Sequence, residues 1–363
     1  MITRADVDKL LGITAAGPSL LSLYLLVPLD PAQLRELPVR ADDLLGKPIQ
    51  AGQRERDTVR RLLAAHARDW LGHTIAIFAC AELGLAEAIP LPGPLPERAV
   101  LAARPHVRPL LLAIQHCPAY LVVVVNRRHT WLLHVVGEEI HAAALPDAES
   151  VRSRGFGGWY GLDSYRINQR VIELTRHHYR DIAALLEQTV HAGDPEPLII
   201  GGHEEEIPQL LATLPAGLRA RFAGSFLADL RTLTAARVRD LADQIVADWL
   251  TRRDQRLITE FGELPGELTT VGLEACIGAA AQHAIDTLLI PAEGLVPGYS
   301  CRRCGALSRT GRGCPHGAAA VVPVPDLIEE ITVSALGGGA LVTALAEPPG
   351  SIAARLRFPL ALA

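Results

Sequence analysis

The feature that most constrains this chain is a set of closely spaced metal-ligand residues in its last third. Cys301 and Cys304 stand three positions apart, and Cys314 is followed two positions later by His316. Two cysteines at this spacing can place both sulfurs on one metal ion, and Gly305 permits a left-handed turn that directs backbone N–H groups at sulfur. The pattern predicts a closed zinc site with four protein ligands, which is typical of a structural role.

Two alternatives to this interpretation stay open from the sequence. His283 could replace His316 as the fourth ligand. The pair Cys301 and Cys304 could also be a redox-active thiol pair, which a Cys-x-x-Cys motif allows. The third cysteine and the histidine at ribbon spacing favour structural Zn²⁺. Cys80, Cys117 and Cys276 are isolated in apolar surroundings and are expected to be reduced core residues.

Composition limits the partners of the whole chain. Its 363 residues predict two or three domains, and a net charge of −5 excludes a generally basic nucleic-acid coat, so any RNA contact must come from a local patch. The start of the chain has no apolar region of a secretory signal, and the apolar stretch 109–125 is interrupted by polar residues and proline. We therefore expect a cytoplasmic protein that does not enter membranes.

The alternation of apolar runs with helical patterns predicts three small α/β domains, at residues 1–107, 108–233 and 234–363, the third carrying an inserted zinc ribbon at 301–317. Strands are expected at 22–27, 74–80, 110–114, 121–125, 130–136, 198–200, 287–291 and 341–344. Helices are expected at 54–70, 164–189, 207–214, 235–261, 270–282 and 326–336.

A glycine-rich segment, residues 152–163 and here called the glycine loop, precedes the predicted helix 164–189. Its centre combines glycines with aromatic residues: Gly155, Phe156, Gly157, Gly158, Trp159 and Tyr160. Glycine makes ordering costly, and a chain accepts that cost where its backbone must flex or approach another molecule closely. Arginines flank the loop on both sides: Arg152, Arg154, Arg166 and Arg170. Exposed aromatics beside arginine suit contacts with unpaired RNA bases and phosphates. The alternative is a surface loop whose aromatics fold back onto the core.

From about residue 109 to the end, the chain resembles the bacterial branch of the archaeo-eukaryotic class-1 peptide release factors and Pelota. The likeness consists of the glycine loop before a long helix, and of a third segment ordered as helix, strand, cysteine ribbon, helix and Gly337-Gly338-Gly339. In release factors, a Gly-Gly-Gln tip positions water against the peptidyl-tRNA ester. The resemblance implies that Gly157 and Gly158 stand at this tip, and that the third domain contacts a translational GTPase such as elongation factor Tu.

Trp159 stands where the release factors carry glutamine. The sequence therefore favours a ribosome-binding factor that occupies the A site in rescue or hibernation, similar to Pelota and Balon, without a working tip. Two alternatives remain: peptidyl-tRNA ester hydrolysis that uses backbone groups of the tip, and a zinc-ribbon scaffold unrelated to RNA. No catalytic side chain can be assigned. Gly201-Gly202 after a strand resembles a nucleotide-binding loop only weakly, because no complete phosphate-binding motif surrounds it.

Overall fold

The structure is a computed structural model that describes residues 2–46, 49, 51–126, 129–137, 139–144, 162–189, 196–230, 232–312, 314, 316 and 320–360. The side chains of residues 143–144 and 162–172 lie outside this description. The chain divides into two compact units. The first unit joins Met1–Cys117 to Asp254–Ala363, and the second is Pro118–Arg253. The fold is mixed α/β with several separate sheets. The three-domain division expected from the sequence stays a prediction.

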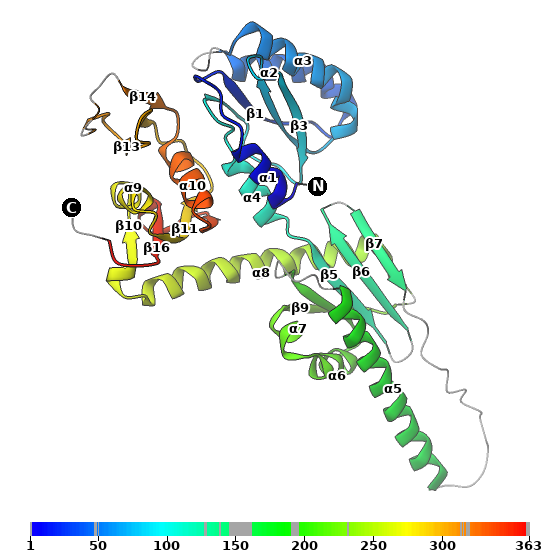
Figure 1. Cartoon of the computed structure of the whole chain (residues 1–363). Helices are drawn as coiled ribbons and strands as arrows, with labels where there is room; N and C mark the ends of the chain where they lie inside the picture. The colour runs from blue at the N-terminus through cyan, green and yellow to red at the C-terminus, as the bar shows by residue number, and fades with distance from the viewer. Residues whose placement is uncertain are drawn as a thin grey trace. The chain divides into compact units, whose positions relative to one another are not determined.

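The N-terminal part of the first unit is an antiparallel sheet in the order β3-β2-β1-β4 with helices on both faces (Figure 1). Its strands are β1 (Leu20–Leu26), β2 (Thr74–Cys80), β3 (Leu85–Leu91) and β4 (Arg98–Ala102). Its helices are α1 (Arg4–Leu11), α2 (Leu37–Leu45), α3 (Gln53–His66) and α4 (Arg108–His116), with short 3-10 turns η1 (Pro31–Glu36) and η2 (Ala67–Trp70). The two central strands are almost wholly buried, which explains their unbroken apolar sequences and confirms the strands predicted there.

The strand predicted at 110–114 is wrong, because these residues lie in α4. Residues 108–113 are buried, and an apolar run that is buried on all sides has no periodicity that separates strand from helix. Pro109 lies in the first turn, where proline favours a helix. The Glu329 carboxylate accepts hydrogen bonds from the N–H groups of Val107, at 2.6 Å, and Arg108, at 3.1 Å. The start of this helix is therefore stabilised by a residue more than two hundred positions away.

The C-terminal part of the first unit contains a sheet in the order β10-β16-β11-β15, in which β11 and β15 are parallel. Its strands are β10 (Thr269–Val271), β11 (Ile285–Pro291), β15 (Leu341–Leu345) and β16 (Ala353–Leu356), its helices are α9 (Leu273–Ala281) and α10 (Leu327–Gly337), and its 3-10 turns are η3 (Gly266–Leu268) and η5 (Pro349–Ser351). A second, small sheet has the order β13-β12-β14, formed by β12 (Gly298–Cys301), β13 (Leu307–Ser308) and β14 (Val321–Val324). The predicted helix 270–282 starts later than expected, because its first residues form β10 and Gly272 turns the chain with φ of +92°.

The second unit is a five-stranded sheet in the order β7-β6-β5-β8-β9, with α5 and α6 packed on one face and α8 on the other. Its strands are β5 (Tyr120–Val125), β6 (Thr130–Val136), β7 (Glu139–Ala144), β8 (Leu198–Gly202) and β9 (Phe222–Leu227), and its helices are α5 (Leu162–Thr189), α6 (Glu206–Thr213) and α7 (Ala216–Ala220). Helix α8 (Ala235–Glu263) begins in this unit. Val125 pairs with Thr130 in an antiparallel register, which confirms the predicted hairpin. Of the helices in the described residues, none combines the length and apolar character that crossing a membrane requires.

Candidate metal centre and glycine loop

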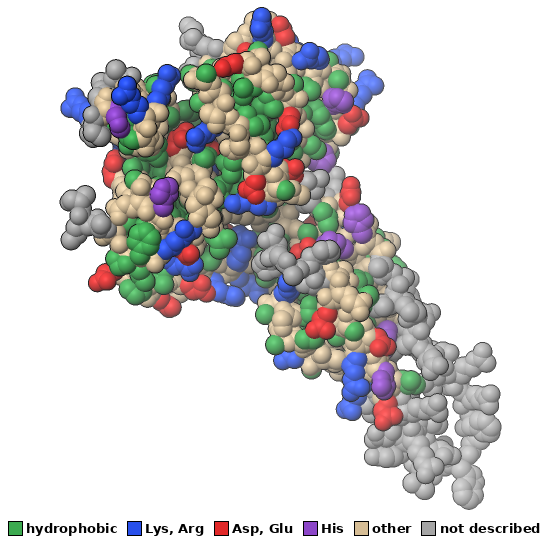
Figure 2. All heavy atoms as spheres, in the orientation of Figure 1, with side chains coloured by type: hydrophobic (Ala, Val, Ile, Leu, Met, Phe, Trp, Pro, Cys, Tyr) green, Lys and Arg blue, Asp and Glu red, His purple; other side chains and the backbone are tan. Residues whose placement is uncertain are grey.

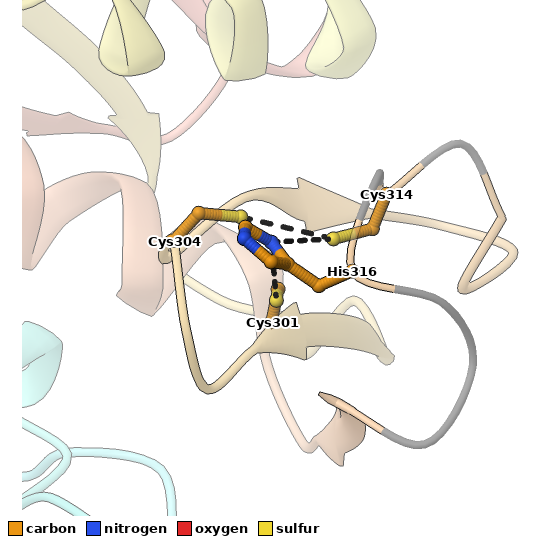
Figure 3. A group of neighbouring side chains, drawn as sticks. All are labelled: Cys301, Cys304, Cys314 and His316. Carbon is orange, nitrogen blue, oxygen red and sulfur yellow. Dashed lines mark hydrogen bonds between the residues drawn. The ribbon is translucent and has the colours of Figure 1, made fainter.

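The small sheet β13-β12-β14 holds the four predicted metal ligands together (Figure 3). Cys301 ends β12, and the chain then turns back through Cys304 into β13. Gly305 has a φ of +71°, and its N–H donates to the Cys301 carbonyl at 2.8 Å. This is the left-handed turn that the sequence predicted at Gly305, and it lets two cysteine side chains face the same point.

The distances between the ligand atoms suit a single tetrahedral metal ion. The Cys304 and Cys314 sulfurs are 3.7 Å apart, and His316 Nδ1 lies 3.7 Å from the Cys314 sulfur and 3.9 Å from the Cys301 sulfur. A tetrahedral zinc ion with Zn–S of about 2.3 Å and Zn–N of about 2.0 Å places sulfurs about 3.8 Å apart and sulfur and nitrogen about 3.5 Å apart. The four residues therefore fit Zn²⁺ and would supply all four of its ligands. The structure brings His316, and not His283, to the three cysteines.

The local backbone also prepares one of the thiols for metal binding. The N–H groups of Cys304 and Arg303 point at the Cys301 sulfur and lower its pKa to about 6. The thiolate is the form that binds metal, so this sulfur is available as a ligand at neutral pH. The His316 backbone N–H has the same lowering effect at Cys314, but the neighbouring thiols Cys301 and Cys304, with burial, raise the pKa of Cys314 overall. A cation that enters between the sulfurs offsets the cost of ionising Cys314 beside the Cys301 sulfur.

A second group of titratable residues was not predicted from the sequence. His106, Asp326 and Glu329 are buried, and each offers a ligand atom within 4.8 Å of the others. Arg108 already forms an ion pair with Asp326 and donates to the carbonyls of Gly294, at 3.0 Å, and Pro291, at 2.7 Å. A guanidinium at this carboxylate supplies the positive charge that a metal would bring, so the group is a buried ion-pair network.

This network shifts the pKa values of its two acids in opposite directions. Burial alone would raise the pKa of Asp326, but its hydrogen bond with His106 and the positive charge of Arg108 outweigh burial, so its pKa is lowered. For Glu329, burial dominates and the pKa is raised. Nothing in the local sequence signals the network, because His106 and Arg108 lie far along the chain from Asp326 and Glu329. Only the packing of α4 against α10 brings them together.

The glycine loop lies outside the described residues. This applies to Arg152, Arg154, Gly155, Phe156, Gly157, Gly158, Trp159 and Tyr160. Arg166 and Arg170 are in the backbone of α5, but their side chains are not described. The structure does place the helix that follows the loop: α5 begins at Leu162, within two residues of the predicted start at 164. The predictions about the loop and its arginines stay predictions.

Gly201 and Gly202, the weak nucleotide-loop candidate, are strand residues in close packing. A methyl group added to Gly201 would meet the Phe226 ring at 2.6 Å, and one added to Gly202 would meet the Val125 carbonyl oxygen at 2.5 Å. Glycine is therefore required here by the neighbouring strands, which gives these positions a structural role.

Residues 105–248, from just before α4 into α8, match the model of bacterial archaeo-eukaryotic release factor family 10. Over this segment the chain is similar to a bacterial archaeo-eukaryotic release factor-like family. The match contains the glycine loop, α5 and the five-stranded sheet of the second unit, so it confirms the family that the sequence suggested. A comparison with curated proteins gives no match.

Solved structures of release factors and their relatives are similar to this chain at low identity. The archaeal translation termination factor aRF1 is 16% identical, with 98% of this chain and 96% of that chain covered and a TM-score of 0.24. Archaeal Pelota, from a model of its ribosome-bound form with ABCE1, is 14% identical over 80% and 78%, with a TM-score of 0.45. Dom34 of S. cerevisiae, a termination-like factor that interacts with Hbs1, is 12% identical over 81% and 82%, with a TM-score of 0.42. All three TM-scores are below 0.5, so the match to a family model over residues 105–248 is the stronger likeness.

Proposed function

We propose that this protein is a ribosome-binding translation factor that occupies the A site in rescue or hibernation and does not hydrolyse peptidyl-tRNA. One observation carries this proposal. Within the segment that matches a release factor family, the tip sequence is Gly157-Gly158-Trp159, directly before α5. An indole has one N–H donor and no acceptor, whereas the amide of glutamine has both. Trp159 therefore cannot supply the polar contacts that position water, but it can stack on RNA bases.

The proposal assigns parts to the rest of the chain. Arg152, Arg154, Arg166 and Arg170 contact ribosomal RNA phosphates, because guanidinium groups bind phosphate oxygens in pairs. The domains are 1–107, 108–233 and 234–363, the last of which contacts a translational GTPase such as elongation factor Tu. Cys301, Cys304, Cys314 and His316 hold a structural Zn²⁺ that stiffens a zinc ribbon at 301–317. The protein acts in the cytoplasm.

A second candidate function is peptide release without the glutamine. The two glycines are retained, and the backbone N–H groups of Gly158 or Trp159 would then polarise the ester or hold the attacking water. The third candidate is a zinc-ribbon scaffold that never meets RNA.

Co-sedimentation with 70S ribosomes, with and without peptidyl-tRNA in the P site, tests the proposal. We expect the protein to pellet with ribosomes and chemical probing to map the glycine loop near the A site. Changing Arg152 and Arg154 to glutamine should weaken binding by about tenfold, since each lost phosphate contact lowers affinity at physiological salt. The matched control changes Arg35 and Arg54, two exposed arginines of the first unit, to glutamine and should bind normally.

A release assay on the same stalled ribosomes separates the candidates. The proposed factor binds and leaves the ester intact. Ester hydrolysis that disappears in the variant with Gly157→Ala and Gly158→Ala would establish the second candidate. Failure to sediment with any ribosomal state, by a protein that is folded and loaded with zinc, would establish the scaffold.

A further inference from the structure

The small sheet that carries the cysteines has a one-sided charge. No acidic residue occurs between Glu293 and Asp326, and the segment contains four arginines: Arg302, Arg303, Arg309 and Arg312. The whole chain has a net charge of −5. Figure 2 shows Lys and Arg side chains gathered over this small sheet, at the upper left of the view. The segment is therefore a local basic patch on an acidic protein, which is the charge distribution that local binding of a polyanion needs.

These four arginines are exposed and available. Within the part of the chain that the structure describes, none of them forms an ion pair or a side-chain hydrogen bond. Other arginines of the same unit are occupied: Arg355 pairs with Asp286, and Arg60 pairs with Asp42 at 2.8 Å. No acid among the described residues therefore pairs with these four charges. They stand in two turns of the same small sheet, Arg302 and Arg303 after β12 and Arg309 and Arg312 after β13.

An aromatic side chain lies beside the arginines. Tyr299 of β12 is 37% exposed, and its ring lies against the turn at Gly311, where an added methyl group would meet ring atoms at 3.1 to 3.3 Å. A hollow of about 260 Å³ opens next to the ring and is lined by Tyr299, Arg312, Ser308 and, from α9, Glu274. A planar group could stack on this ring. The Ser308 hydroxyl and the Glu274 carboxylate offer hydrogen bonds to the polar edges of a base.

We propose that Tyr299, Arg302, Arg303, Arg309 and Arg312, here called the basic face, bind single-stranded RNA. The arginines contact successive phosphates, and a base stacks on Tyr299. This is a second RNA contact, separate from the glycine loop, and it does not depend on A-site binding. An acidic protein segment would also satisfy the charges, but the exposed ring beside a hollow favours a ligand that has planar groups between its anions.

The test measures binding of the full chain to a fluorescein-labelled single-stranded RNA of mixed sequence by anisotropy, over a range of salt concentrations. Replacing the four arginines of the basic face by glutamine should weaken binding at least about tenfold. It should also reduce the slope of log K against log salt by about 2 to 3, since each phosphate contact on a single strand contributes about 0.7. The control replaces four other exposed arginines: Arg35, Arg54, Arg68 and Arg256. Its net charge is the same, so it should bind RNA as the unchanged protein does.

A second pair of variants tests the ring. Tyr299→Ala should weaken single-stranded RNA binding about tenfold, and Tyr299→Phe should keep it, because stacking needs the ring and not the hydroxyl. Zinc content and circular dichroism check that each variant is folded. Equal affinities of the basic-face and control variants would overturn the proposal. Competition by poly-glutamate as effective as by RNA, with no effect of Tyr299→Ala, would overturn it in favour of an acidic protein partner. The assay uses free RNA, so its failure is distinct from failure of ribosome binding.

Discussion

His316 reaches the metal-ligand group from a position only two residues after Cys314, where a second Cys-x-x-Cys spacing is absent. The longer imidazole side chain compensates for a spacing that is one residue shorter, because its Nδ1 lies further from the backbone than a cysteine sulfur does. Its distances of 3.7 and 3.9 Å to two sulfurs show that the shortened spacing still converges on one point. At the residue scale, the group is complete without a ligand from elsewhere in the described chain.

Replacing Cys304 by serine should therefore remove metal. We expect about one equivalent of zinc in the unchanged protein and almost none in Cys304→Ser, because a structural site needs all four ligands to hold the ion tightly. Elemental analysis of the purified proteins measures this. The control is Cys117→Ser, a half-buried cysteine of the first unit outside the group, which should keep its zinc. Equal metal content in both variants would contradict the assignment.

Asp326 should give the protein a specific sensitivity to acid. Its folded pKa is lowered beneath an ordinary value of about 3.9, so its contribution to stability is present above about pH 4 and is lost as the pH falls through the folded pKa. The raised pKa of Glu329 acts in the opposite direction; burial is its main cause, and the charge of Asp326 adds to it. Urea unfolding of the protein and of Asp326→Asn between pH 2.5 and 7 should show a smaller acid-induced loss in the variant. Parallel pH profiles would mean that Asp326 is not coupled to His106 and Arg108.

At the scale of single elements, β8 shows how a strand end that resembles a nucleotide loop is dictated by its neighbours. Its two glycines are buried between β5 and β9, where the Phe226 ring and the Val125 carbonyl occupy the space of a side chain. The parallel order β5-β8-β9 brings these groups close, and no property of the Gly-Gly pair itself does so.

Gly201→Ala should accordingly destabilise the second unit by about 1 to 3 kcal/mol, the usual cost of overpacking. Gly217→Ala is the matched control, since Gly217 is exposed in α7 with nothing near the added methyl group. That change should be neutral or stabilising by up to about 1 kcal/mol. Thermal or urea unfolding measures both. If Gly201→Ala were as stable as the control, the close approach of Phe226 to β8 would be incorrect.

At the scale of the whole molecule, the first unit is discontinuous, with the second unit inserted between its two halves. One apolar core contains Leu110 and Leu111 of α4 together with Ile328 and Ile331 of α10. Beside this core, Arg108 bonds to Asp326 and to two carbonyls of the C-terminal half. The two halves therefore share both apolar packing and a buried ion pair, so they are expected to unfold together.

Arg108→Met should weaken both halves at once. Removing one partner leaves Asp326 buried without its cation, which typically costs about 3 to 5 kcal/mol. Hydrogen exchange should rise in α4 and in α10, while β5 and β8 of the other unit keep their protection. Arg60→Met breaks an exposed ion pair and should cost less than about 1 kcal/mol. Faster exchange confined to α4 would show that the halves are not coupled.

The sequence by itself determined the features that depend on neighbouring residues. The spacing of Cys301, Cys304, Cys314 and His316 predicted a group that the structure brings together, and the loop before α5 led to a family that the match over residues 105–248 confirms. The 3.6-residue period predicted α5, and paired apolar runs predicted the hairpin of β5 and β6. Ligand spacing, helical period and turn residues depend on only a few neighbouring positions, so the sequence alone is enough to predict them.

Tertiary structure alone decided the features whose partners lie far apart in the chain. The apolar run at 110–114 became helix α4 because Glu329 receives its first N–H groups and both sides of the run are buried. Two further features also join distant segments. One is the buried network of His106, Arg108, Asp326 and Glu329, and the other is the hollow between Tyr299 and Glu274. A segment that is buried on every side has no hydrophobic periodicity from which its secondary structure can be predicted. The partner of a charged residue is known only when packing brings the two groups within a few ångströms.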